Sequence, residues 1–302
     1  MKPAINHQIA LIGVPMDLGA GTRGSNLGPE AIRIAGIKKR LEDIGYQVDD
    51  RGDIPADRKK AETLEGSNLK NLNEILRVNR LLCQEVAKAM EEGKMPVILG
   101  GDHSIAIGSI FGVLQNKKNL GVIWFDAHGD INTDHTSPSG NLHGMPVSVL
   151  MGIGPEELTS IGNGAFLKRE NMVYVGSRDL DPEERKAMKE QGIKVFTMYE
   201  IDDMGIKKVM EEAIRIAGNG TDGIHVSFDM DAMDPEIAPG TGTKVAGGMG
   251  YRETHYAMEM IAKSNKLVSV EFVEVNPLLD QGNKTAEAAV ALSGSLLGEW
   301  LI

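Results

Sequence analysis

The stretch GVIWFDAHGDINT, residues 121–133, begins with a short run of apolar and β-branched residues and ends in closely spaced Asp and His side chains. This run is one of eight apolar runs, each typical of a strand, and their arrangement decides the fold class. Between most such runs lie segments with apolar residues three or four positions apart, which is typical of helices. This alternation predicts an α/β fold, a three-layer α/β/α sandwich around a mostly parallel eight-stranded sheet. The eight runs expected to form strands are 9–14, 46–50, 95–99, 121–126, 172–176, 194–198, 223–230 and 267–275.

Two of these runs, 95–99 and 267–275, are almost continuously apolar, which indicates that helices cover both faces of their strands. We expect one domain over residues 1–302, a length that a single large α/β sheet with its helices can reach. An open parallel sheet carries its site beyond the carboxyl ends of its strands. The functional residues are therefore expected in the long irregular segments at 16–27, 127–146, 177–182 and 231–248.

The composition narrows the class of partner. The formal net charge is −11, from 43 acidic and 32 basic residues, which argues against nucleic acid or an anionic membrane and fits a cationic substrate or metal ions. Part of this excess is ordinary surface charge, so its sign is only a weak indicator. The single cysteine, Cys83, cannot form an internal disulfide. No secretory signal or run of ~18 apolar residues occurs, so we expect a cytoplasmic protein.

The residues that end the first-quoted run are candidate metal ligands. Asp126, His128 and Asp130 lie two positions apart, so all three would point to one face if the strand stayed extended. The alternative is a turn in which Asp130 caps the backbone and His128 is an ordinary polar residue. The triplet alone leaves both interpretations open.

Two further runs favour a metal site. In VSFDMDAMDP, residues 226–235, Asp229 and Asp231 repeat the spacing of two after another apolar strand. Four carboxylates at the ends of two buried strands would repel one another unless cations lie between them. The run VILGGDHSIAIG, residues 97–108, adds His103, although alone it could be a helix start capped by Asp102 or Ser104.

The candidate ligand set suits two divalent cations. Four carboxylates and two imidazoles without a thiolate favour Mn²⁺ over Zn²⁺, which prefers His and Cys. Four carboxylates also balance the charge of two such ions, and a metal pair can present a bridging water as hydroxide. The set comprises His103, Asp126, His128, Asp130, Asp229 and Asp231.

Five motifs taken together resemble the ureohydrolase family, and within it the arginases of bacterial type. Each motif alone is weak, but the joint match is specific and extends from about Ile9 to the C-terminus. The resemblance implies an α/β sandwich around an eight-stranded parallel sheet and two Mn²⁺ per chain. It further implies hydrolysis of L-arginine to L-ornithine and urea by a metal-bridging hydroxide. The motifs are, in chain order, GGDHSIAIG, DAHGDINT, SPSGNLHGMP, SFDMDAMDP and EVNP.

The same resemblance implies roles for individual residues near the metals. Asp130 would orient the hydroxide, and His143 would protonate the departing ornithine amine. Glu274 would pair with the guanidinium; its apolar neighbours argue against the alternative of a surface charge. One manganese would be held by His103, Asp126, Asp130 and Asp229, and the other by Asp126, His128, Asp229 and Asp231.

The amino-acid end of the substrate would be held by the loop from Asn132 to Asn141. Asp181 would reach the α-amino group with Glu184 behind it, although DLDPEE also has the pattern of a helix start with an acidic first turn. Thr243 matches a hydroxyl that lies near the metals in the family. The alternative is that it is an ordinary loop residue. The α-carboxylate would be bound by Asn132, Ser139 and Asn141, with Ser137 standing where many relatives have Thr.

Other functions remain as rivals to this interpretation. An agmatinase or guanidinobutyrase would use the same metals, but the SPSGN loop favours a substrate that carries a carboxylate. Zinc deacetylases of related fold need ligands for only one metal. A non-catalytic structural relative would be expected to have lost a ligand or His143, and none is missing. The family also implies a homo-oligomer, a trimer or hexamer. The pair Met249 and Gly250 departs from the usual Leu and Thr of the family but removes no ligand.

Overall fold

The computed structural model describes residues 7–57 and 68–299. All eight expected strands are confirmed, and every pairing between them is parallel, so the sheet is wholly rather than mostly parallel. The strand order is β2-β1-β3-β8-β7-β4-β5-β6. The strands are β1 Gln8–Gly13, β2 Gln47–Asp53, β3 Met95–Leu99, β4 Leu120–Phe125, β5 Met172–Ser177, β6 Lys194–Thr197, β7 Gly223–Asp229 and β8 Leu267–Val273.

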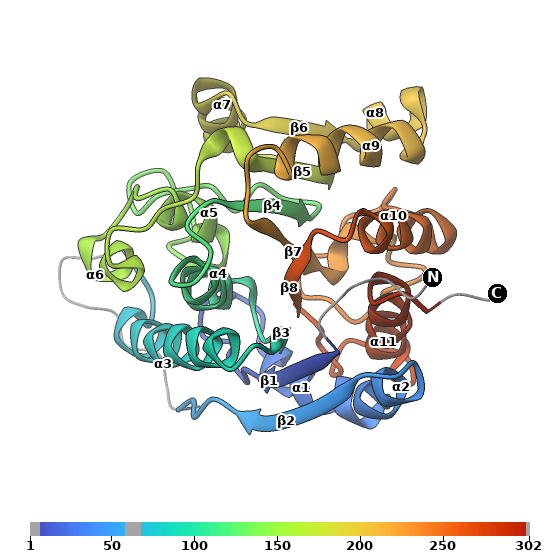
Figure 1. The fold of residues 1–302 in the computed structure, drawn as a ribbon. Helices are drawn as coiled ribbons and strands as arrows, with labels where there is room; N and C mark the ends of the chain where they lie inside the picture. Colours follow the sequence, from blue (N-terminus) through green and yellow to red (C-terminus); the bar gives the residue numbers. More distant parts are fainter. Residues whose placement is uncertain (1–6, 58–67, 300–302) are drawn as a thin grey trace.

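Helices cover both faces of the sheet, as the continuous apolar strands predicted (Figure 1). One hydrophobic core lies beneath α1 Gly28–Ile34, α2 Ile37–Asp43, α8 Met198–Met204, α9 Ile206–Ala217, α10 Tyr251–Ser264 and α11 Lys284–Leu296. The second core lies beneath α3 Leu72–Glu91, α4 Ala106–Leu114, α5 Pro146–Leu150, α6 Glu156–Thr159 and α7 Pro182–Gln191. The three-layer α/β/α sandwich is therefore confirmed.

The register of the central strands determines where the site forms. Leu99 pairs with Phe272, Phe272 with Phe228, and Phe228 with Phe125, so the four residues form one row across β3, β8, β7 and β4. Each lies at or next to the carboxyl end of its strand. The segments that follow these four residues therefore leave the sheet side by side, which brings parts of the chain that are distant in sequence to one place.

The N-terminal loop packs tightly over this edge. A Cβ atom on Gly101 would lie 2.0 Å from the carbonyl oxygen of Met16, so only glycine allows the two backbones to approach this closely. The Gly19 N–H donates to the buried Asp102 carboxylate at 2.8 Å. The loop that follows β1 is thus fixed against the segment that follows β3. Among the described residues, no helix is both long enough and apolar enough to cross a membrane.

Candidate metal centre and active site

The chain turns immediately after β4, which ends at Phe125. The His128 N–H donates to Asp126 Oδ1 at 2.7 Å, and Asp130 has a left-handed backbone with φ of 48°. Of the two interpretations left open by the sequence, the backbone therefore takes the turn, which is made by Asp126 rather than by Asp130. A side chain that accepts from the backbone two residues ahead makes a tight turn, and this turn brings Asp126, His128 and Asp130 together.

The chain makes the same kind of turn after β7. Asp229 is the last residue of this strand, and Asp231 lies in a short 3-10 helix, Met230–Ala232. The Asp231 N–H donates to Asp229 Oδ1 at 2.7 Å, and the Ala127 N–H donates to Asp231 Oδ1 at 3.2 Å. The second of these bonds joins the two turns to each other.

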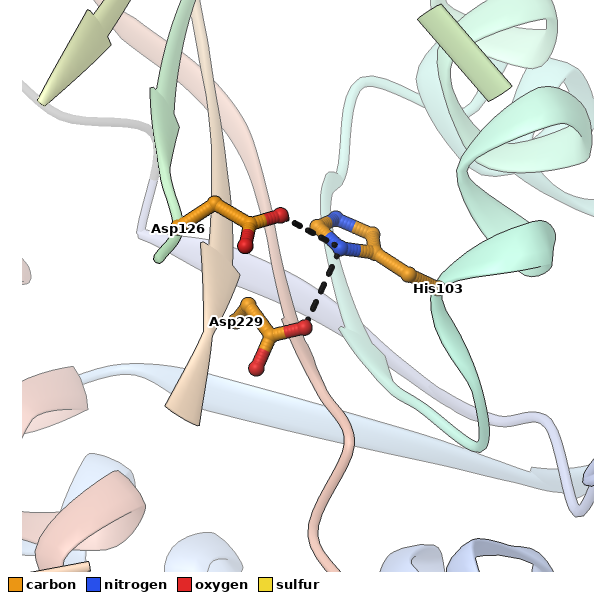
Figure 2. A group of neighbouring side chains, drawn as sticks. All are labelled: His103, Asp126 and Asp229. Carbon is orange, nitrogen blue, oxygen red and sulfur yellow. Dashed lines mark ion pairs between the residues drawn. The ribbon is translucent and has the colours of Figure 1, made fainter. Parts of the chain in front are cut away.

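His103 approaches from β3 and completes a first group of candidate ligands (Figure 2). Asp102 does cap the short 3-10 helix His103–Ile105 by accepting from the Ser104 N–H at 3.0 Å, so the capping alternative holds for Asp102. His103 is nevertheless not incidental. Its Nδ1 lies 3.2 Å from Asp126 Oδ2, 3.1 Å from Asp130 Oδ2 and 3.2 Å from Asp229 Oδ2.

A second group of candidate ligands lies beside the first. His128 Nδ1 is 3.1 Å from Asp231 Oδ2 and 3.5 Å from Asp126 Oδ1. In each group the candidate ligand atoms lie within 4.8 Å of one another, and Asp126 belongs to both. The structure therefore brings all six residues of the candidate ligand set together, with Asp130 next to the first group.

The hydrogen bonds around His103 show that this site fits a cation. Ser227 Oγ donates to Glu271 Oε1 at 2.7 Å, so it must accept from His103 Nε2, 2.8 Å away. This pattern puts a proton on Nε2, so the buried Nδ1 is the nitrogen that faces the carboxylate oxygens of Asp126, Asp130 and Asp229. Burial lowers the pKa of His103, but the interactions with Asp126, Asp130 and Asp229 outweigh this and raise the pKa well above its usual value. A divalent cation can take the place of the Nδ1 proton among these oxygens.

The carboxyl groups lead to the same conclusion. Burial, followed by the charges of Asp231 and Asp126, raises the pKa of Asp229 well above its usual range. Burial and the charge of Asp126 likewise raise the pKa of Asp130 to about 6. The site thus resists holding its full negative charge without cations, and its oxygen and imidazole donors suit divalent ions.

Several supporting residues were missed by the sequence reasoning. Trp124 Nε1 donates to Asp126 Oδ2 at 2.9 Å, and the Trp124 ring stacks on the His103 ring with centroids 4.1 Å apart. Ser227 and Glu271 lie within buried strands and position His103 as described above. The available signal was a polar residue inside an otherwise apolar strand, because such a residue must find a partner.

His143 and Glu274 form a pair next to the candidate ligands. Glu274 Oε1 accepts from the His103 N–H at 2.9 Å and lies 3.2 Å from His143 Nδ1. Burial of His143 disfavours its charged form, but the hydrogen bond and charge of Glu274 outweigh this and raise the pKa of His143 to about 9. Glu274 is buried, 2% exposed, with a φ of 62°, so it is not a surface charge.

A cavity of about 220 Å³ opens onto the candidate ligands, with His128, Asp130 and Asp229 in its wall. His143 also lines it, whereas Glu274 is not among its lining residues. Asn141 is absent from the lining, and its amide oxygen accepts from Lys70 Nζ at 2.9 Å. The other expected substrate-binding residues do line the cavity: Asn132, Ser137, Ser139, Asp181, Glu184 and Thr243.

The segment DLDPEE, residues 179–184, is both a helix start and part of the cavity wall. Asp181 caps α7 by accepting from the Glu184 N–H at 2.9 Å, and the Glu184 carboxylate accepts from the Asp181 N–H at 3.0 Å. The other oxygen of Asp181 accepts from Asn132 Nδ2 at 2.7 Å, which ties the helix start to the loop after β4. Thr243 Oγ1 donates to Asp231 Oδ2 at 3.0 Å, so it is not simply a loop residue.

An all-parallel α/β sheet that gathers imidazoles and carboxylates at the ends of its central strands defines a metal-dependent α/β enzyme. Comparison with known proteins narrows this class. The model of the Arginase family matches residues 7–298, so the chain belongs to the arginase family. It is a hydrolase that acts on the C–N bond of an amidine.

Individual relatives agree with this family over their whole length. The arginase of Bacillus subtilis (strain 168) is 53% identical over 299 residues, which cover 99% of this chain and 100% of that protein. The structure of arginase from Bacillus caldovelox has a TM-score of 0.94 and 51% identity, covering 100% of both chains. The structure of Entamoeba histolytica arginase in complex with L-ornithine has a TM-score of 0.90 and 36% identity, covering 97% of this chain and 98% of that one.

Proposed function

We propose that this protein is an arginase that hydrolyses L-arginine to L-ornithine and urea with two Mn²⁺ per chain. The observation that carries the proposal is the cavity, which brings His128, Asp130 and Asp229 into one space with His143 and the loop at Ser137 and Ser139. The arginases to which the chain is about half identical support the same reaction.

The proposed ligands follow from the two groups at the strand ends. Asp126 and Asp229 would contribute to both sites, and the position of His103 Nδ1 among three carboxylates supports its role in the first site. Oxygen-rich sites of this kind favour Mn²⁺ over Zn²⁺. When bound, the metal pair supplies a water of lowered pKa as nucleophile. The first site would comprise His103, Asp126, Asp130 and Asp229, and the second Asp126, His128 and Asp231, to which the family resemblance adds Asp229.

His143 would supply the proton for the leaving amine. Burial lowers the pKa of His143, but Glu274 outweighs this and favours the protonated imidazole. Glu274 also holds Nδ1, which leaves Nε2 to donate into the cavity that His143 lines. Asp130, at the cavity wall, would orient the attacking water. The described hydrogen bonds of the Glu274 side chain both go to Oε1, which would leave Oε2 to accept from an N–H of the guanidinium.

The loop after β4 would hold the α-carboxylate of the substrate. Ser137 Oγ accepts from the Gly140 N–H and Ser139 Oγ from the Asn141 N–H, so both hydroxyl protons remain to be donated. Asn132 donates one of its two amide protons to Asp181 and retains the other. Asn141 would add a further donor. Asp181, supported by Glu184, would accept from the α-amino group, and Thr243 would steady Asp231.

We also propose a cytoplasmic location and a homo-oligomeric state, a trimer or hexamer. The family resemblance supports the assembly. The location is supported by the lone cysteine, because Cys83 is free and buried and no disulfide can form within the chain.

The direct test is to measure urea release from L-arginine and from agmatine by the purified, Mn²⁺-loaded protein. Agmatine lacks the carboxylate, so the hydroxyl and amide donors of the loop would be left without a partner, and such mismatches discriminate by ~10⁴. We expect rapid urea release from arginine and very little from agmatine. Comparable rates on both substrates would replace the arginase assignment with a broader guanidino-hydrolase.

A further inference from the structure

Lys70 lies against the loop proposed to read the substrate carboxylate. Its Nζ donates to Asn141 Oδ1 at 2.9 Å, and its backbone N–H donates to Gly140 O at 3.2 Å. A Cβ atom on Gly140, whose φ is 69°, would lie 2.0 Å from the carbonyl oxygen of Asn68. The segment that precedes α3 is therefore in close contact with the loop between Ser137 and Asn141, 70 residues further along the chain.

The contact with Lys70 fixes the direction of the Asn141 amide. A lysine ammonium can only donate hydrogen bonds, so the amide must turn its oxygen toward Lys70. The amide nitrogen then points away from Lys70, and it lies near Gly21, where an added Cβ would be 3.0 Å from Asn141 Nδ2. Asn141 is thereby oriented as a donor, which is what binding of a carboxylate requires.

The charge of the cavity is a second reason to expect that Lys70 affects the binding of a carboxylate. Apart from the proposed metal ligands, three acidic residues line it, namely Asp179, Asp181 and Glu184, and its described lining includes no lysine or arginine. A substrate carboxylate that enters this cavity therefore meets repulsion unless a cation lies nearby. Lys70 provides a positive charge at the loop that the carboxylate would approach.

From these contacts we propose that Lys70 is a specificity-determining positioning residue, which orients Asn141 and favours substrates that carry an α-carboxylate. The inference rests on the proposed function, because it assigns a partner to the carboxylate of arginine. Lys70 acts through Asn141 and through its charge, so it should affect substrate binding more than the chemical step.

The test compares Lys70→Met, Lys70→Arg and the unsubstituted protein, all full-length and Mn²⁺-loaded. For Lys70→Met we expect the KM for L-arginine to rise roughly tenfold with kcat nearly unchanged, because a hydrogen bond to a charged group is lost. The KM for agmatine should not rise. Lys70→Arg keeps the charge and the donors, so it should restore most of the arginine affinity. Added salt should raise the KM for arginine less in Lys70→Met than in the unsubstituted protein.

Lys168→Met is a matched control. Lys168 Nζ also donates to an asparagine amide, Asn119 Oδ1 at 2.6 Å, but both residues precede the amino ends of their strands, at the opposite edge of the sheet. This variant loses the same charge and the same kind of bond, and it should retain the KM for arginine.

Calorimetry with L-ornithine and putrescine gives a readout that is independent of turnover. Lys70→Met should weaken ornithine binding and spare putrescine, which has no carboxylate. An unchanged KM and ornithine affinity, or equal losses on substrates with and without the carboxylate, would overturn the role of Lys70. Absence of arginine turnover in the unsubstituted protein would instead refute the proposed function, while the ornithine comparison would still decide the role of Lys70.

Discussion

Glu274→Gln should lower the pKa of His143 while nearly preserving the shape of the side chain. The Glu274 carboxylate lies 3.2 Å from His143 Nδ1 and contributes most to raising the pKa of His143 from 6.5 to about 9. The difference of about 2.5 in pKa corresponds to roughly 3 kcal/mol. This is a net difference, because burial lowers the pKa while Asp130 and Asp102 add to the effect of Glu274, so the substitution should lower the pKa by an amount of this order. A fall of this size takes the protonated fraction of His143 at pH 8 from about 90% to about 3%.

The assay is an NMR titration of the histidine rings in metal-free protein, with the His143 signals assigned from their loss in His143→Asn. The raised pKa contributes stability that is fully present below about pH 6.5 and is lost as the pH rises through about 9. The free energy of unfolding of the unsubstituted protein should therefore exceed that of Glu274→Gln by a margin that shrinks over this range. A His143 titration midpoint that is the same in both proteins would refute the argument.

Three further predictions concern the metals, the proton donor and the carboxylate. Asp229→Asn should empty at least one metal site and abolish turnover, because it removes a proposed bridging charge; a folded variant with full metal content by elemental analysis and unchanged urea release would contradict this. His143→Asn should retain its metals and lose roughly 10²-fold in kcat, so a fall in metal content would mean that His143 is a ligand. Replacing Asn132 and Asn141 together by Ala should reduce kcat/KM for arginine and leave the weak agmatine rate nearly unchanged, whereas equal losses on both substrates would remove the carboxylate-reading role.

The sequence predicted the sheet well because buried parallel strands leave a strong local signal. All eight strands appear at the expected runs, and their parallel arrangement brings the ligand-type residues to one edge. The local geometry at that edge was less predictable. The turns after Phe125 and at Asp229 depend on side-chain to backbone hydrogen bonds, which the spacing of two does not distinguish from an extended strand.

The supporting residues could not be predicted because their roles depend on neighbours that are distant in the chain. Ser227 and Glu271 pair across β7 and β8, and Lys70 meets Asn141 only because two loops are packed together. Glu274 was expected to face the substrate, and its contact with His143 becomes visible only in the folded chain. DLDPEE was ambiguous for a physical reason, since Asp181 caps a helix and also lines the cavity.

The most direct test of the central claim is a titration of the metal-free protein with Mn²⁺ while urea release from saturating L-arginine is measured. The two ligand groups that share Asp126 predict that activity rises and reaches its plateau at two Mn²⁺ per chain. A plateau at one Mn²⁺ per chain, or urea release that does not depend on added metal, would contradict the proposed dinuclear site.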